Sequence, residues 1–127
     1  MALDYGSART GVAVSDPTGT LARPLGVVER ASTESGLAEL ARLVREEDAE
    51  RVVVGLPLTL RGTRGEQAAE TERFVEALRV VVDVPVELHD ERFTTDLAQQ
   101  TAGAAPEDAL AAAHLLSTYL EWCAARS

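Results

Sequence analysis

A short apolar segment in the middle of the chain constrains the fold more than any other feature. Residues 51–57 read RVVVGLP, with an unbroken apolar stretch from Val52 to Leu56. Such a run of β-branched residues is typical of a strand that is covered on both faces. Segments with helical periodicity lie on either side of it, so the chain is predicted to be an α/β protein whose sheet is partly parallel.

Helical spacing and turn residues define the elements around this strand. Leu37, Leu40 and Val44 recur at helical spacing after Ser35, where the first helix is predicted to begin. Pro106 is suited to the first turn of the last helix, and the acidic residues that follow it favour the helix dipole. The other elements predicted in this half are a helix over residues 66–81, a strand over 84–89, a short helix from Thr95 or Asp96 to Gln100, and the rest of the last helix over 109–122.

The first thirty residues have a different pattern, with short apolar segments joined by turns. Residues 1–3 run into an Asp-Tyr-Gly turn, and residues 11–16 lead into a Pro-Thr-Gly turn. Residues 21–28 supply a third strand, although Pro24 weakens its first half. This pattern predicts an antiparallel meander, so the whole sheet is expected to be mixed, five-stranded and flanked by helices.

Size, charge and cysteine content limit the class of protein. A length of 127 residues suits a single domain, which we assign to residues 1–127. The single cysteine, Cys123, excludes an internal disulfide and fits a reducing compartment. Because no apolar stretch is long enough to span a membrane and no leader pattern is present, we expect a cytoplasmic protein. The net charge of −9 disfavours a protein that coats duplex nucleic acid.

Three carboxylates fall at the ends of predicted core elements. Asp4 ends the first strand, Glu91 ends the last strand, and Asp108 lies in the first turn of the last helix. Strand ends converge at one edge of a sheet, where gathered acids repel one another unless cations bind between them. Oxygen ligands of this kind suit Mg²⁺ or Mn²⁺, and a pair of such ions supports phosphodiester cleavage. The alternative is structural, since acids are common at such positions and Asp108 also favours the helix dipole.

Four arginines are candidates for contacts to substrate phosphates. Arg92 follows Glu91, so it is suited either to clamping a phosphate or to pairing with a carboxylate and orienting the site. Arg61 and Arg64 lie in one glycine-flanked loop, and Arg9 lies in the first turn. For these three, simple exposure to solvent is the alternative.

The opening residues 4–11, DYGSARTG, resemble the D-x-G-x-x-x-x-G turn that begins RNase H-like and actin-like folds. The glycines permit a tight turn and let backbone N–H groups approach a ligand. This turn by itself does not separate a nuclease from a phosphotransferase.

The chain as a whole resembles the YqgF family, also called RuvX, whose members are described as Holliday junction resolvases and as pre-ribosomal-RNA nucleases. The matching segments occur in order along essentially the whole chain, at residues 3–6 (LDYG), 11–16 (GVAVSD), 23–25 (RPL), 53–58 (VVGLPL), 62–63 (GT), 89–95 (HDERFTT), 108–112 (DALAA) and 119–120 (YL).

The resemblance implies an RNase H-like fold and places the family's acidic residues at Asp4, Glu91 and Asp108. It implies a metal-dependent nuclease that leaves a 5′-phosphate and a 3′-hydroxyl. The favoured role is 5′-end maturation of pre-16S rRNA, and cleavage of Holliday junction DNA is the second choice.

The sequence departs from the family in two places. Family members usually carry a lysine- or arginine-rich segment before the last helix, whereas residues 101–105 here contain no basic residue. This puts strong binding of large duplex or junction substrates in doubt. The first strand is also short, since only three residues precede Asp4.

Two other functions are compatible with the sequence. An actin-like phosphotransferase or ATPase needs two lobes to enclose its nucleotide, and this chain supplies one. A non-catalytic nucleic-acid-binding or ribosome-assembly module fits the acidic charge, but the presence of all three acids disfavours it. The expected partners are nucleic acid, with RNA favoured over a DNA junction, and ribosomal particles, with no membrane. The chain is expected to be a monomer or a homodimer.

Overall fold

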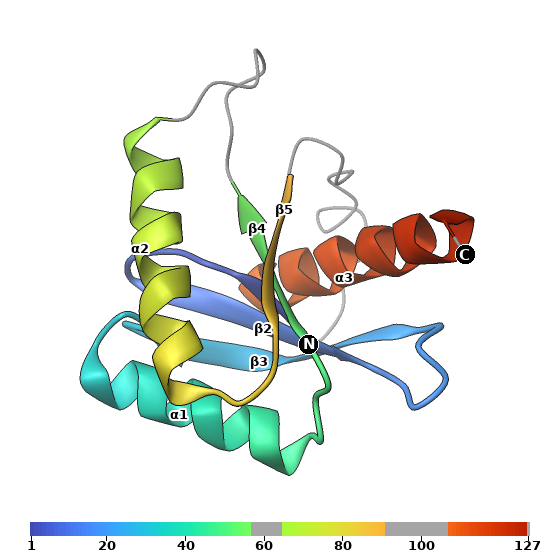
Figure 1. Ribbon diagram of the computed structural model, residues 1–127, viewed down its shortest axis with the longest axis horizontal. Coiled ribbons are helices and arrows are strands. Elements are labelled where there is room, and N and C mark those ends of the chain that lie inside the picture. Colours follow the sequence, from blue (N-terminus) through green and yellow to red (C-terminus); the bar gives the residue numbers. More distant parts are fainter. Residues whose placement is uncertain (57–64, 91–106, 127) are drawn as a thin grey trace.

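The computed structural model describes residues 1–56, 65–90 and 107–126, which form a central sheet with helices on both faces (Figure 1). In chain order the elements are β1 (Ala2–Asp4), β2 (Arg9–Ser15), β3 (Ala22–Glu29), α1 (Glu34–Glu46), β4 (Val52–Leu56), α2 (Glu66–Val81), β5 (Val86–Asp90) and α3 (Glu107–Arg126). Within this described part, no helix is long and apolar enough to cross a bilayer.

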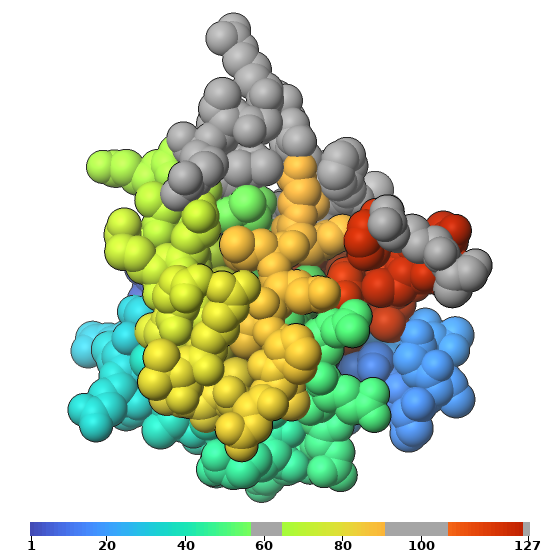
Figure 2. All heavy atoms as spheres, viewed as in Figure 1, coloured from blue at the N-terminus to red at the C-terminus, as the bar shows by residue number. Residues whose placement is uncertain are grey.

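The sheet has the strand order β3-β2-β1-β4-β5. β1 pairs with β2, and β2 with β3, in antiparallel fashion, whereas β1–β4 and β4–β5 are parallel pairs. The α/β class, the meander and the mixed five-stranded sheet are therefore confirmed, and the arrangement is an RNase H-like fold. β5 is the last strand on its side and lies at the surface beside α2 (Figure 2).

The central position of β4 explains the apolar run that predicted it. Every residue from Val52 to Gly55 is buried. Val52 and Val54 belong to the core on one face of the sheet, and Val53 belongs to the core on the other. Helices cover both faces, so a polar side chain at Val52, Val53 or Val54 would be buried and would need a hydrogen-bond partner.

Two hydrophobic cores lie on opposite faces of the sheet. The first packs α1 and α2 against one face and is built mainly from valines, together with larger side chains such as Leu3, Leu40, Phe74 and Leu78. The second packs α3 against the other face. Its buried members include several small residues and are Ala2, Ala13, Val53, Ala112, Leu115, Leu116 and Tyr119.

Several element boundaries differ from the predicted ones. β2 begins at Arg9 because the ladder with β3 extends to an Arg9–Glu29 pair. α1 begins at Glu34, since the side chain of Thr33 accepts a hydrogen bond from the Gly36 N–H at 3.2 Å and caps the helix. α2 spans the predicted residues, β5 covers Val86–Asp90, and α3 continues to Arg126. The predicted short helix at residues 95–100 lies outside the described residues.

Pro24 did not shorten its strand. β3 is an edge strand, where the missing N–H of a proline costs no ladder hydrogen bond if it faces outward. The register between β2 and β3 shifts between Val12 and Ala13, opposite the segment that contains Pro24. The irregularity accommodates the proline while the strand continues to Glu29.

Candidate active site

Asp4 ends β1 on the face of the sheet that α3 covers. Ala2 packs in the α3 core, whereas Leu3 packs in the opposite core. Tyr5 stacks on Phe74 of α2, with the two ring centroids 4.3 Å apart. Because side chains alternate along a strand, Asp4 shares the face of Ala2 and is directed to the side of α3.

The turn after Asp4 depends on Gly6. A Cβ atom at this position would lie 2.5 Å from the carbonyl oxygen of Arg9, so a larger residue would force the turn open. The Gly6 N–H donates to the hydroxyl of Thr10, and that hydroxyl donates to the Gly6 carbonyl, both at 3.4 Å. Thr10 is fully buried, and the turn therefore brings the chain back tightly against β1.

The first turn of α3 packs directly against Gly11 of β2. Its Cα is the cross-strand partner of Asp4. A Cβ atom at Gly11 would lie 1.8 Å from the carbonyl oxygen of Asp108 and 3.0 Å from the nitrogen of Ala109. No side chain fits in that space, so the glycine allows the helix backbone to touch the strand. The contact brings the turn that carries Asp108 to the strand pair that ends in Asp4.

Arg9 pairs with Asp108 across this junction. The Arg9 Nε lies 3.4 Å from the Asp108 Oδ2, and the two side chains are 65% and 35% exposed. Arg9 lies two residues before Gly11 on the same strand, hence on the face that α3 covers. The sequence predicted Arg9 as a substrate contact, and the structure gives it a carboxylate partner in the candidate site.

The other predicted site residues, Glu91, Arg92, Arg61 and Arg64, lie outside the described residues. β5 ends at Asp90, which is paired with Leu56, the last residue of the parallel strand β4. In the described part of the chain, no three histidine, cysteine or carboxylate groups form a metal-binding cluster. Of the predicted acids, the structure places Asp4 and Asp108 on elements that contact each other through Gly11.

A second polar cluster connects the far half of α3 to β5 and to Arg51, the residue before β4. The Tyr119 hydroxyl donates to Glu87, and it accepts a hydrogen bond of 2.9 Å from Arg51. Burial, followed by the hydrogen bond to Glu87, raises the pKa of Tyr119 to about 12. His89 lies against Tyr119 and Trp122, with ring centroids 5.5 Å and 5.9 Å away. The sequence reasoning missed this cluster, because its members are spread over three elements and form no local motif.

Burial lowers the pKa of His89, although Asp90 and Glu87 act in the opposite direction. Its Nε2 atom is buried and has no hydrogen-bond partner in the ranges that the structure describes. A neutral imidazole is therefore favoured in the folded chain.

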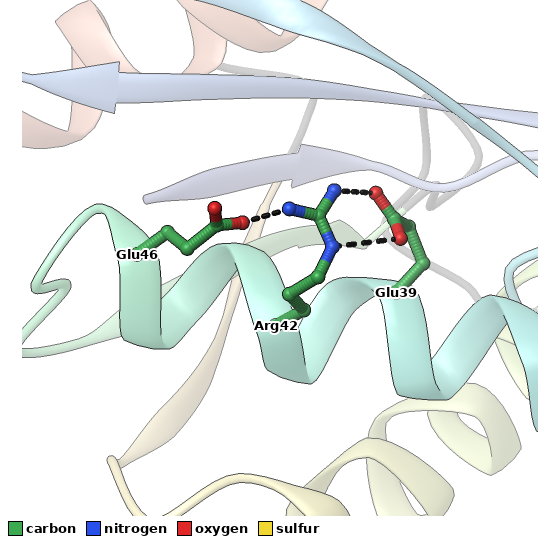
Figure 3. A network of polar contacts seen from close by, with 3 residues as sticks. All are labelled: Glu39, Arg42 and Glu46. Atoms are coloured by element: carbon green, nitrogen blue, oxygen red, sulfur yellow. Dashed lines mark hydrogen bonds and ion pairs between the residues drawn. The ribbon is translucent and has the colours of Figure 1, made fainter.

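Two acids of α1, away from the candidate site, share one arginine. On α1, Arg42 lies between Glu39 and Glu46 and pairs with both (Figure 3). The Arg42 guanidinium holds the pKa of Glu39 below its usual value. Such exposed pairs along one helix contribute little to stability.

A hollow of about 1090 Å³ lies away from the candidate acids, between the β2–β3 turn, the start of β4 and the second half of α3. Its lining contains Arg23 paired with Glu47 but neither Asp4 nor Asp108. The hollow is therefore separate from the candidate active site.

Comparison with known proteins points to one family. The chain matches the model of the RuvX family, described as Holliday junction resolvase, over residues 1–122. It is 44% identical over 130 aligned positions to a protein of Chloroflexus aggregans named "Putative pre-16S rRNA nuclease", covering 95% of this chain and 92% of that protein. Proteins of the same name from Syntrophomonas wolfei (35% identity, covering 95% of this chain and 92% of the relative) and Roseiflexus sp. RS-1 (43% identity, covering 79% and 71%) are also similar.

Proposed function

Because this chain belongs to the RuvX family of Holliday junction resolvases, we propose that it is a metal-dependent nuclease that uses Asp4, Glu91 and Asp108 as its metal ligands. It hydrolyses phosphodiester bonds, with residues 1–127 acting as one domain. Relatives that carry a nuclease name support the activity. The placement of Asp4 and Asp108 supports the site.

The observation that carries this proposal is the contact of Gly11 with the backbone of Asp108. A glycine in the middle of a strand weakens the strand, so its use there needs a reason. The reason is a close approach, since even one Cβ atom would collide with the Asp108 carbonyl at 1.8 Å. This approach places Asp108, in the first turn of α3, beside the β1–β2 pair, in which Asp4 is the last residue of β1.

The donor set fits a hard divalent cation. Carboxylate oxygens are ligands of Mg²⁺ and Mn²⁺, and neither Cys123 nor a histidine is among the proposed ligands. When bound, such a cation supplies charge for the phosphate and lowers the barrier to attack by water. In this proposal Asp4 contributes from the middle of the sheet, Asp108 from α3, and Glu91 from the residue directly after β5.

The proposed substrate is RNA, namely the precursor of 16S rRNA at its 5′ end. The names of the relatives support this choice. A chain with a net charge of −9 and no lysine is poorly suited to covering a long duplex, which favours single-stranded RNA over a four-way junction. Arg9, Arg61, Arg64 and Arg92 are the proposed phosphate contacts. The work is proposed to take place in the cytoplasm, on ribosomal particles.

A cleavage assay tests the proposal. The substrates are a labelled single-stranded RNA that contains the 5′ boundary of 16S rRNA and a labelled four-way DNA junction, each with Mn²⁺ or with chelator. The enzymes are the parent chain, Asp4→Asn and Glu107→Gln. Glu107 is an exposed acid next to Asp108, so its variant controls for the loss of one carboxylate at the same helix end.

The proposal predicts Mn²⁺-dependent cleavage of the RNA by the parent chain and Glu107→Gln, and loss of cleavage in Asp4→Asn. Preferential cleavage of the junction would instead favour the resolvase activity for which the family is described. Binding of RNA with no cleavage, unaffected by Asp4→Asn, would contradict the nuclease and favour a binding module.

A further inference from the structure

The ion pair between Arg9 and Asp108 joins a basic residue to a proposed metal ligand. We propose that Arg9 is a built-in counter-cation of Asp108, which neutralises this carboxylate in the metal-free protein and competes with the divalent cation for it. The inference rests on the proposed function, because it takes Asp108 to be a metal ligand.

Both partners have fixed backbones, and one has a movable side chain. Arg9 is the first residue of β2 and is paired with Glu29 of β3. The backbone of Asp108 is held against Gly11, two residues farther along the same strand. The Arg9 side chain is 65% exposed, so it can leave the carboxylate without opening a core. The pair is therefore a local contact that can be exchanged without rebuilding the fold.

The surrounding charge explains why a counter-cation is needed there. Asp4 ends β1 opposite Gly11, and the backbone of Asp108 contacts Gly11, so the two acids belong to neighbouring positions of the fold. Without a cation, these carboxylates repel one another. Arg9 is the basic partner that the described residues provide for Asp108. It reduces the repulsion until a metal ion takes over the same role.

The Arg9 guanidinium and a divalent ion compete for the Asp108 carboxylate. A metal ion at this carboxylate places positive charge next to the guanidinium, whose Nε is only 3.4 Å from Oδ2. Each cation must therefore weaken the binding of the other, and the coupling is reciprocal. An exposed ion pair of this kind is weak, so its removal should tighten metal binding by about two- to fivefold in Kd.

The chain contains a matched control pair. Arg23 lies 3.4 Å from Glu47, with side-chain exposures of 63% and 29%, nearly the same as for Arg9 and Asp108. Arg23→Gln removes the same charge and an equivalent ion pair away from Asp4 and Asp108. Arg9→Lys keeps the charge beside Asp108 and serves as the conservative variant.

The test is a Mn²⁺ titration in the absence of nucleic acid. Electron paramagnetic resonance of free Mn²⁺ gives the Kd, and thermal unfolding in Mn²⁺ or in chelator gives the change in Tm. Arg9→Gln should bind Mn²⁺ about two- to fivefold more tightly than the parent chain, whereas Arg9→Lys and Arg23→Gln should keep the Kd of the parent. Arg9→Gln should also show the largest rise in Tm on Mn²⁺ addition, because only this variant lacks the competing cation.

The outcomes separate this inference from the proposed function. If the parent chain binds Mn²⁺ and Asp108→Asn does not, but Arg9→Gln binds like the parent or more weakly, the counter-cation role is wrong and the metal site stands. If Mn²⁺ binds neither the parent nor Arg9→Gln, the metal site itself fails, and the inference fails with it. Tighter binding by Arg23→Gln equal to that of Arg9→Gln would reduce the effect to net charge and also overturn the inference.

Discussion

The two faces of the sheet are packed in different ways. On the face under α1 and α2, the strands contribute Leu3 and several valines, which pack against larger helix side chains such as Leu40 and Phe74. The face under α3 uses alanines and, at Gly11, no side chain at all, so that the helix backbone touches the strand. Large side chains bury more apolar area and stabilise the fold, whereas small residues permit close approach. The first face is thus built for stability and the second for placing Asp108.

The largest expected effect of a single substitution is on the α1–α2 face. Phe74→Ala should lower the free energy of unfolding by about 3–5 kcal/mol, because it leaves a cavity in the core and removes the ring that stacks on Tyr5. Urea denaturation measures the loss. Val80→Ala, at a position that is 85% exposed, should change stability by no more than about 0.5 kcal/mol. Equal losses in both variants would contradict the assignment of this core.

The next largest effect is expected for Gly11→Ala, which should differ from Phe74→Ala in its response to Mn²⁺. Gly11→Ala should cost about 1–3 kcal/mol, because the added Cβ must push α3 away from β2. It should also abolish the rise in Tm that Mn²⁺ produces, since Asp108 moves with the helix. Phe74→Ala, by contrast, should keep a rise in Tm with Mn²⁺ while the fold persists.

Gly26→Ala is the control for Gly11→Ala. A Cβ at Gly26 of β3 meets no atom within 4 Å. This variant should keep both stability and the response to Mn²⁺. If Gly11→Ala behaved like Gly26→Ala, the close approach of α3 would not be what positions Asp108.

A smaller effect is expected at the far half of α3. Tyr119→Phe removes the hydroxyl that bonds to Glu87 and Arg51, and should cost about 0.5–1.5 kcal/mol in urea denaturation. Tyr5→Phe, which loses one hydrogen bond of 3.2 Å to Glu70 on the other face, should cost less. A larger loss for Tyr5→Phe than for Tyr119→Phe would show that the hydrogen bonds of Tyr119 to Arg51 and Glu87 do not anchor α3.

The smallest effect concerns pH. Burial lowers the pKa of His89 in the folded state, so the unfolded chain binds more protons as the pH falls through the usual histidine range near about 6.5. Stability should therefore fall on acidification from neutral pH into this range. His89→Gln should lose less stability over the same interval. Identical pH profiles of parent and variant, measured by urea denaturation, would exclude this contribution.

Much of the fold could be predicted from local patterns, and the site only in part. The apolar run at Val52–Val54 fixed a strand covered on both faces, and helical spacing gave the bounds of α2. Arg9 was placed near the site by its turn, but its pairing with Asp108 could not be read from the sequence. Likewise, a glycine within a strand indicates that another part of the chain comes close to it. The sequence does not show which part, because Asp108 is nearly a hundred residues away from Gly11.

In the proposed site, Asp4 and Asp108 bind the same metal ion because α3 contacts β2 at Gly11. The most direct test is the Mn²⁺ affinity of the parent chain, Asp4→Asn, Asp108→Asn and the double variant, with Glu107→Gln as control. If both acids bind one ion, each single substitution at Asp4 or Asp108 should weaken binding by at least about tenfold, and the double variant should lose less than the sum of the two changes in binding free energy. Mn²⁺ binding that is unchanged in either single variant would contradict this shared site.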